Sequence, residues 1–240
     1  MREIFSEIVR HTGGLGFIEI VKITGTEEST LVEAMDNDKT VIIKGNLYNP
    51  VPEFEGEFGM SSLVLIKGLV DHPSFKTDEA HVEIERQDEA PSDITFTNEE
   101  GTSSSYRFMS AQLVPNQAKF LGTEWDVEFT PTKSKIAEFS SFAGLYSFES
   151  LFMVDTKGDQ LRFHIGDPAS ASHKATVMFA KGIEGKMSAG LYWPVSQVLS
   201  ILKLADEDTA TMRFSAKGAL QISLESTFAK WDYILPAKKR

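Results

Sequence analysis

The sequence predicts an α+β fold dominated by antiparallel sheet, built by repeated use of one helix-and-strands unit. Four amphipathic segments, beginning near Met1, Phe58, Pro131 and Pro194, are each followed by a run of strand-like segments. Their spacing is about 60 residues, which is typical of a repeated supersecondary unit, and it is stretched once near Leu113. With 41% hydrophobic residues and 17 phenylalanines, the chain can also bury a substantial core against its sheets.

In the first half, residues 2–11 form the first predicted helix. Ile4, Phe5 and Ile8 lie on one helical face, and Gly13 follows as a stop signal. A second helix is predicted at 58–70, because its apolar residues recur at helical spacing up to the turn before a proline. The strands predicted in this half span 16–23, 29–35, 40–46, 81–86, 93–97 and 103–109.

In the second half, a helix is predicted to begin at Thr130 and Pro131, which suit the N-cap and the first helical position. Lys133 and Lys135 fall in its first turn, where the helix dipole disfavours cations, so these lysines favour a role outside the fold. A fourth helix is predicted at 193–205. The strands predicted here span 124–129, 149–156, 160–165, 174–181, 185–191, 210–216 and 219–228, followed by a tail at 231–240.

We therefore predict two similar domains, 1–112 and 119–240, joined by a linker at 113–118. The net charge is −11, but residues 1–118 carry −12 and residues 119–240 carry +1. One interpretation is chance distribution combined with solubility. The other is that an acidic half meets the neutral, lysine-richer half of a neighbouring copy. A head-to-tail contact of that kind closes into a ring if the rotation allows it.

Motifs that carry chemistry do not occur in the sequence. The absence of cysteine excludes disulfides and thiolate metal sites and fits a reducing cytosol. The five histidines are scattered without the spacing of metal ligands, and Gly182–Lys186 resembles a phosphate loop only superficially. No apolar run is long enough to cross a membrane. We expect a protein that is not an enzyme, with no metal and no cofactor.

Three short sequence segments occur within this order of predicted helices and strands: AMDNDK at 34–39, LVPN at 113–116 and WDYILP at 231–236. Together they resemble the DNA polymerase sliding clamps. The pattern is closest to the clamps of T-even-type bacteriophages and is similar to proliferating cell nuclear antigen. The resemblance covers the whole chain as a pattern rather than as one dense motif.

The resemblance implies two clamp domains per protomer, each with two helices on antiparallel sheets, and a head-to-tail homotrimeric ring. The helices of such a ring line a hole that encircles double-stranded DNA without sequence recognition. The ring tethers the replicative DNA polymerase, confers processivity and is placed on DNA by an ATP-dependent clamp loader. It performs no chemistry and needs no cofactor. We expect it in the cytoplasm, which is the host cell cytoplasm if the protein is viral.

Weak phosphate contacts are enough for such a role, because a ring that encircles DNA needs little affinity and must slide. Basic residues on the helices are the candidates to face DNA, although each is equally compatible with an ordinary solvated helix charge. The candidates are Arg2, Arg10, Lys67, Lys133, Lys135 and Lys203.

The resemblance also implies a hydrophobic groove for a partner peptide beside the linker and the C-terminal tail. The matching positions are Met35, Leu113, Val114, Tyr233, Ile234, Leu235 and Pro236. Ordinary packing of the tail onto the sheet is the alternative for these residues. For the trimer interface, the resemblance pairs segment 103–109 with segment 174–181 of a neighbouring copy. The residues expected there are Tyr106, Phe108, Lys174, Val177, Phe179 and Lys181.

Two other functions fit the same composition. An oligomeric structural or scaffold protein of a virus, without DNA binding, would also be rich in strands, acidic and free of cysteine. Repeated helices with basic or hydroxyl faces favour the clamp over this alternative. A small-molecule binding β protein would need a deep apolar pocket, which the sequence does not locate.

Overall fold

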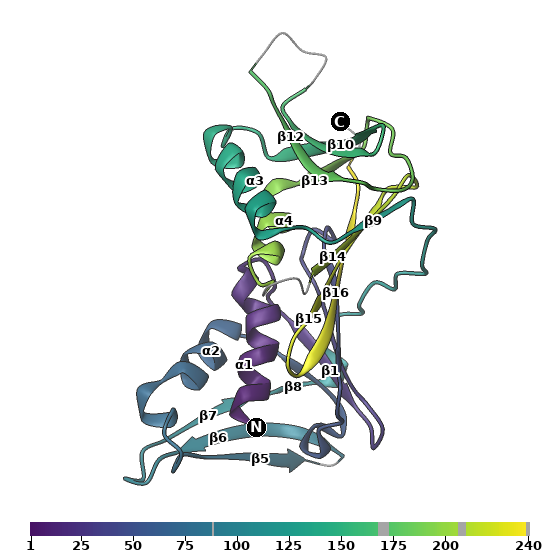
Figure 1. Ribbon diagram of the computed structural model, residues 1–240. Coiled ribbons are helices and arrows are strands. Elements are labelled where there is room, and N and C mark those ends of the chain that lie inside the picture. The colour runs from purple at the N-terminus through teal and green to yellow at the C-terminus, as the bar shows by residue number, and fades with distance from the viewer. Residues whose placement is uncertain (88, 168–172, 206–209, 239–240) are drawn as a thin grey trace. The chain divides into compact units, whose positions relative to one another are not determined.

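The computed structural model describes residues 1–87, 89–167, 173–205 and 210–238. The chain divides into two compact units. Unit 1 consists of Met1–Lys119 and Thr227–Trp231, and unit 2 of Phe120–Ser226 and Asp232–Arg240. The main division follows Lys119, directly after the predicted linker at 113–118. Each unit combines helices with antiparallel strands (Figure 1), so the predicted α+β class is confirmed.

In unit 1, two helices accompany two groups of strands. The helices are α1 (Arg2–His11) and α2 (Leu63–Asp71). The first group, in spatial order, is β8 (Met109–Ser110), β4 (Gly56–Met60), β1 (Val21–Gly25), β2 (Thr30–Met35) and β3 (Ile42–Leu47). The second is β5 (His81–Gln87), β6 (Ala90–Thr97) and β7 (Ser103–Arg107). Short 3-10 turns lie at Gly13–Leu15, Pro52–Phe54, Pro73–Phe75 and Ala111–Leu113.

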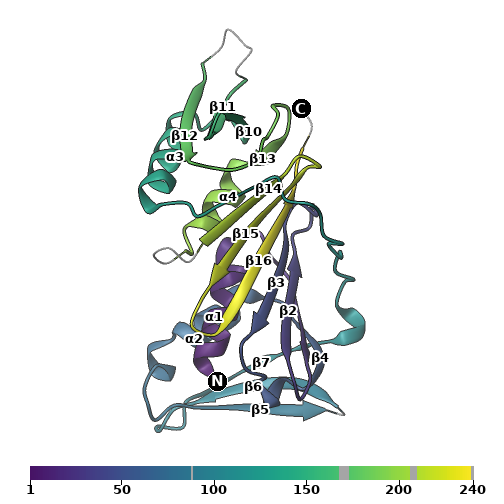
Figure 2. The ribbon, with the colours of Figure 1, turned by 45° about the vertical axis from the view of Figure 1, so that its right-hand side comes forward.

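Unit 2 repeats this plan. Its helices are α3 (Lys133–Leu145) and α4 (Val195–Leu202). One group of strands, in order, is β16 (Ala229–Pro236), β15 (Ala219–Glu225), β14 (Ala210–Ser215) and β9 (Val127–Phe129). The first three lie side by side in Figure 2. The other is β12 (Ala175–Lys181), β11 (Gln160–Ile165), β10 (Leu151–Lys157) and β13 (Tyr192–Pro194).

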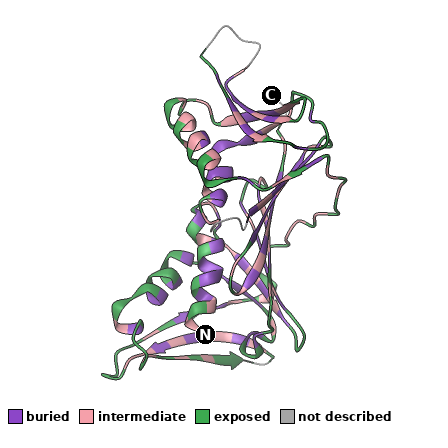
Figure 3. Cartoon of the chain, in the orientation of Figure 1, coloured by how far each residue is buried: buried purple, intermediate pink, exposed green. Residues whose placement is uncertain are grey.

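The core of unit 1 lies between α1 and the strands. Burial alternates along β1 and β2, as expected for strands with one face on a core. Phe5 on α1 meets Phe54 edge-on, with ring centroids 5.1 Å apart, and Phe58 on β4 meets Phe108 at 4.8 Å. In Figure 3 the helices carry buried and exposed residues on different sides.

A cluster of aromatic rings forms the core of unit 2. Phe163 on β11 stacks on Phe179 of β12 at 4.0 Å and lies 4.8 Å from Phe152 on β10. Phe139 of α3 meets the same ring edge-on at 5.3 Å, and Phe214 of β14 meets it at 5.9 Å. Phe163 therefore joins the helix to both groups of strands.

A buried polar cluster fixes α1 to the start of β16 within unit 1. The Trp231 indole Nε1 donates to Glu7 Oε1 at 2.9 Å, and the His11 ring stacks on the indole at 4.6 Å. Gly45 lies against the same indole, and a Cβ atom there would come within 2.4 Å of it. A buried indole N–H needs such an acceptor, so these residues fix where the C-terminal strand begins.

The second helix begins later than predicted. Residues 56–60 form β4, in which Phe58 pairs with Ile23 and Met60 with Val21. Ser62 then takes a left-handed conformation (φ 49°), which separates the strand from α2. The apolar residues of 58–60 fit a helical spacing in the sequence, but pairing with β1 buries them as a strand.

Other boundaries also differ from the prediction; for example, the strand predicted at 16–23 begins only at Val21. Thr132, not Thr130, caps α3, and its Oγ1 accepts from the Lys135 N–H at 3.3 Å. The predicted strand at 185–191 is irregular, with positive φ at Gly185 and Gly190, and pairing begins instead at β13. The tail 231–240 carries no predicted element, but most of its described part continues β16.

Candidate functional site

The basic residues of α1 lie at its two ends. Arg2 is half-buried, and its Nη1 donates to the Phe75 carbonyl at 2.5 Å and to the Thr77 carbonyl at 3.5 Å. This guanidinium therefore ties the start of α1 to the turn that follows α2. Arg10 is exposed in the last turn of α1. Of the two arginines predicted to face DNA, Arg2 thus has a structural role inside unit 1.

On α2, Lys67 belongs to a small surface ion network. Its Nζ lies 2.7 Å from Asp71 Oδ2, and Lys76 Nζ lies 3.2 Å from Asp71 Oδ1. Hydrogen bonds from the two lysines hold the pKa of the Asp71 carboxyl below its ordinary value. The local charge around Lys67 is therefore partly compensated. The other exposed residues of α2 include the apolar Val64 and Leu65.

In unit 2, Lys133 and Lys203 meet at one groove. The two residues are 70 positions apart in the sequence, but both line a hollow of about 290 Å³ beside α3 and α4. Its other lining residues are mostly apolar: Pro131, Ile136, Ala137, Ser140, Leu202, Ala205 and Ala210. Lys135 lies in the same first turn of α3, but its Nζ pairs with Glu138 Oε2 at 2.6 Å. Of the three candidate lysines in unit 2, Lys133 and Lys203 therefore line the groove, and Lys135 pairs with Glu138.

The predicted docking residues of unit 1 lie near an ordered turn and the linker. Met35 ends β2 half-buried, and Asp36 follows it, with its Oδ1 accepting from the Thr40 and Val41 N–H groups at 2.7 Å. Leu113 is 71% exposed. Val114 is half-buried against Gly59, where a Cβ atom would come within 2.5 Å of its side chain. Leu113 is therefore the apolar linker residue most open to a partner.

The docking residues predicted in the tail belong to β16. Tyr233, Ile234 and Leu235 are buried, and the Leu235 carbonyl accepts from the Trp193 indole at 3.2 Å. Pro236, the last residue of the strand, is exposed. The burial of Tyr233, Ile234 and Leu235 fits the alternative interpretation, in which the tail simply packs onto the sheet. Among the tail residues predicted to dock a partner, Pro236 is the exposed one.

Four of the six residues predicted at the trimer interface lie in the core of their own unit. Tyr106 and Phe108 are buried in unit 1, and Val177 and Phe179 in unit 2. Lys174 and Lys181 are exposed. Among the described strands, β7 and β12 each form the edge of their group. A contact with another copy would therefore use the free backbone edges and the outward residues, not these four side chains.

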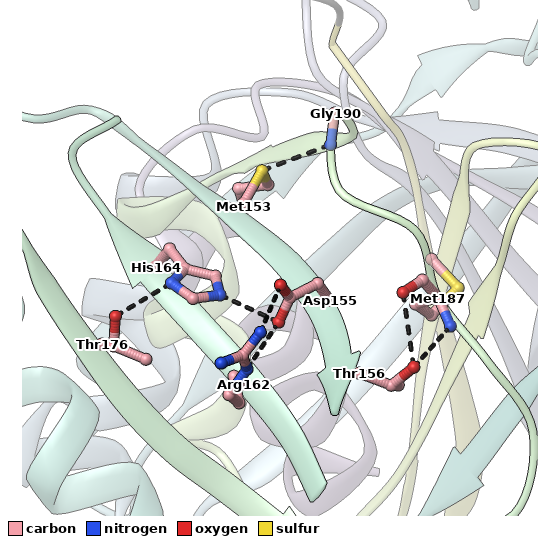
Figure 4. Close-up of polar contacts among 8 residues, drawn as sticks. All are labelled: Met153, Asp155, Thr156, Arg162, His164, Thr176, Met187 and Gly190. Atoms are coloured by element: carbon pink, nitrogen blue, oxygen red, sulfur yellow. Dashed lines mark hydrogen bonds and ion pairs between the residues drawn. The ribbon is translucent and has the colours of Figure 1, made fainter. Parts of the chain in front are cut away.

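A polar network on β10, β11 and β12 is not predicted from the sequence (Figure 4). Arg162 holds both carboxylate oxygens of Asp155, at 2.8 and 2.7 Å. His164 Nε2 lies 2.9 Å from Asp155 Oδ1, and its Nδ1 lies 2.9 Å from the Thr176 hydroxyl. The sequence feature that could have indicated this network is the alternation of the polar residues 162 and 164 with the apolar residues Leu161 and Phe163, which are buried. The network links three strands on the side facing away from the aromatic core.

Asp155 should make the stability of the protein sensitive to acid. Burial raises the pKa of Asp155, but hydrogen bonds from Arg162 and His164 outweigh it, so the pKa lies below its ordinary value. A depressed carboxyl pKa contributes stability above the unfolded pKa of about 3.9, and this contribution is lost as pH falls through the folded pKa. Asp155→Asn should cost about 1–2 kcal/mol at neutral pH.

Urea unfolding from neutral pH downward tests this expectation. The difference in unfolding free energy between wild type and Asp155→Asn should begin to decrease below a pH of about 4. Glu184→Gln, which removes an exposed carboxylate in the same unit, is the matched control and should change little. A difference that stays constant across the acid range would contradict the role of the Asp155 charge.

No group of three or more histidine, aspartate or glutamate residues in the part of the chain that the structure describes is arranged to hold a metal ion. No helix within the described ranges has the length and apolar character needed to cross a membrane.

Comparison with known proteins identifies the fold. No family model and no curated protein sequence matches the chain. Solved structures match it almost end to end. A. fulgidus PCNA, in a structure with the C-terminal region of FEN-1, matches with a TM-score of 0.72 and 12% identity, covering 100% of this chain and 97% of that one. PCNA from Thermococcus kodakaraensis matches with a TM-score of 0.71 and 16% identity, covering 99% and 96%.

The PCNA2–PCNA3 complex from Sulfolobus tokodaii matches with a TM-score of 0.68 and 12% identity, covering 99% of this chain and 96% of that one. At such identities the likeness concerns the fold. Over its full length, the chain has the fold of PCNA sliding clamps.

Proposed function

We propose that this protein is a DNA sliding clamp that encircles duplex DNA as a homotrimer and tethers a replicative DNA polymerase. The observation that carries the proposal is the match to PCNA over 99–100% of the chain, with four helices in two similar units. A scaffold protein would not need this arrangement. The ring itself performs no chemistry and takes no cofactor, and an ATP-dependent clamp loader places it on DNA.

The edges of the strand groups support a ring. Among the described strands, β7 in unit 1 and β12 in unit 2 are outer strands of their groups, and β5, β8, β9 and β13 are outer strands as well. Unprotected edges are a liability that pairing removes. Pairing β7 of one copy with β12 of the next is a heterologous contact, which closes into a ring when the rotation allows it.

The charges support non-specific contact with DNA inside the ring. Lys133 and Lys203 at the α3–α4 groove, with Arg10 on α1, are the contacts we favour among the predicted set. Lysine–phosphate contacts of this kind are weak and independent of sequence, which permits sliding. The net charge of −11 would keep DNA away from the outer surface.

We further propose that clients dock beside Met35, the linker and Pro236, and that the protein functions in the cytoplasm of a cell infected by a T-even-like phage. The exposed Leu113 supports an apolar docking surface, because an open leucine in a linker is costly unless a partner covers it. The phage origin rests on the sequence pattern alone.

Retention on DNA with blocked ends tests the proposal without any partner protein. The protein is threaded onto a linear duplex whose far end carries streptavidin, and the free end is then blocked. A ring should resist a wash at about 1 M salt, where the Debye length is about 3 Å and phosphate contacts are screened. It should be lost when one end is reopened.

Sedimentation of the free protein should show a trimer, and primer extension with a polymerase and loader should lengthen the products. The rival function, a viral scaffold without DNA binding, predicts no retention in either configuration. Equal loss from blocked and open duplexes would contradict encirclement, because it would show that only surface charges hold the DNA.

A further inference from the structure

The α3–α4 groove contains a hollow that contacts with DNA phosphates do not require. Its volume of about 290 Å³ lies close to the lower end of the range for small-molecule pockets, about 300–1,000 Å³. Lysines that meet phosphates need only be exposed, as Lys133 and Lys203 are. The space beside these two lysines is therefore not explained by the proposed DNA binding.

The hollow exists because α3 is seated loosely on the rest of unit 2. Within α3, which the structure describes in full, Phe139 is the one buried residue. Ile136 and Ala137 precede it and line the hollow, the first half-buried and the second exposed. Apolar groups beside an unfilled space lose dispersion contacts. A guest molecule that filled this space would restore them. The shorter helix α4, by contrast, buries Val195, Val198, Leu199, Ile201 and Leu202.

The apolar part of the lining suits an aliphatic chain. None of the described residues that line the hollow is aromatic, so the hollow offers no ring on which a flat ligand could stack. Methylene groups are favourably buried against aliphatic side chains of this kind. The apolar lining residues belong to the start of α3, the end of α4 and the start of β14: Pro131, Ile136, Ala137, Leu202, Ala205 and Ala210.

The polar part of the lining suits an anion. Lys133 and Lys203 supply two ammonium groups, and no acidic residue is among the described residues that line the hollow. The half-buried Ser140 adds a hydroxyl that can donate a hydrogen bond. The nearest carboxylate along α3, that of Glu138, pairs with Lys135 at 2.6 Å. The hollow thus combines an aliphatic lining with donors that carry positive charge.

We propose that this hollow binds an amphiphilic anion of the medium-chain fatty acid class. The carboxylate meets Lys133 and Lys203, and the unbranched chain lies against the aliphatic lining. A water molecule occupies about 30 Å³ of liquid, and a methylene group is of similar size, so the hollow holds up to about ten carbon atoms.

Such a ligand would compete with DNA for the same lysines. This consequence rests on the proposed function, whereas ligand binding itself does not. If both lysines contact phosphates, saturating octanoate should weaken association with a duplex at least about threefold, and DNA should weaken octanoate binding by the same factor. Acetate at the same concentration, which gives the same ionic strength without a chain, should change little.

A chain-length series measures ligand binding on the full chain without DNA. Calorimetry with acetate, butyrate, hexanoate, octanoate and decanoate should show an affinity that rises up to about fourfold with each buried methylene group. Octanoate should bind with a dissociation constant below about 1 mM. The rise should stop near ten carbons, where the hollow is full. Octanol, which has the same chain without the charge, should bind more weakly than octanoate.

Two variants locate the ligand. Ala137→Leu fills the hollow with a residue of similar helix propensity and should weaken octanoate binding at least about tenfold. Lys133→Gln with Lys203→Gln should weaken octanoate binding at least about threefold but leave octanol binding unchanged. The matched controls are Ser141→Leu, at an exposed α3 position outside the hollow, and Lys157→Gln with Lys186→Gln. Both controls should bind octanoate as wild type does.

The outcomes separate this proposal from the ring. Affinity that keeps rising beyond about twelve carbons, or that Ala137→Leu leaves within about twofold, would show that the chains adsorb elsewhere and would overturn the site. Equal binding of octanol and octanoate would overturn the role of the lysines and with it the anionic ligand. Octanoate binding with no effect on DNA association would support the site and contradict the DNA contacts assigned to Lys133 and Lys203.

Discussion

Replacing Lys133 and Lys203 together by glutamate should reduce association with duplex DNA at least about tenfold at low salt. Both lysines line the α3–α4 groove, and a trimer would present the pair three times. Each phosphate interaction that the double variant removes should also flatten the dependence of log affinity on log salt by about 0.9. Fluorescence anisotropy with a labelled duplex, between about 50 and 200 mM salt, measures both effects.

The matched control is Lys157→Glu with Lys186→Glu. These lysines are exposed in the same unit and give the same change in net charge, but they lie outside the helices. If the control weakens DNA binding as strongly as the groove variant, net charge rather than the groove decides the affinity. Retention between blocked ends should survive the groove variant if its ring still forms, because encirclement does not depend on phosphate contacts.

The groove could not be predicted from the sequence, although the lysines in it could. Lys133 and Lys203 are identifiable as basic residues on predicted helices, but they come from helices separated by several strands. The packing of α3 on α4 brings them together. Lys135, in the same turn as Lys133, pairs with Glu138 at i+3, a spacing that the sequence does contain.

The type of element could be predicted from the sequence where the apolar residues of a segment followed one period, either helical or alternating. The helix 2–11 and strand 160–165 agree with α1 and β11 because their apolar spacing fits one structure only. The helix predicted at 58–70 was right only from Leu63, because a strand and a helix meet within this segment. The boundary between the strand and the helix depends on the positive φ of Ser62, which cannot be predicted from the sequence.

The residues predicted at the trimer interface show a different limit of prediction from the sequence. Val177 and Phe179 are interface candidates because the resemblance places their strand at an edge, and β12 is an edge among the described strands. Their alternation with Thr176 and Met178 is the signal that they face the core instead. An edge strand offers its backbone and one face to a partner, so the strand and the side chains must be predicted separately.

Phe163→Ala should cost about 3–5 kcal/mol of unfolding free energy, the range for removing a fully buried phenylalanine. The ring contacts Phe152, Phe179, Phe139 and Phe214, which come from three strands and a helix. Truncation would open a cavity where these elements meet. Since a typical domain has only about 5–15 kcal/mol of stability, unit 2 should lose a large part of its stability.

Urea unfolding of the monomer, at a concentration too low for assembly, measures this destabilisation without a contribution from other copies. Phe163→Leu keeps most of the volume and should cost less than about 1.5 kcal/mol, while Leu121→Ala removes an exposed side chain and should cost almost nothing. Hydrogen exchange should locate the weakening in unit 2. Because α3 and β12 both rest on this cluster, the α3–α4 groove and the strand edge should be disrupted together. A destabilisation below about 1 kcal/mol, or an equal decrease of protection in unit 1, would show that the aromatic cluster does not hold unit 2 together.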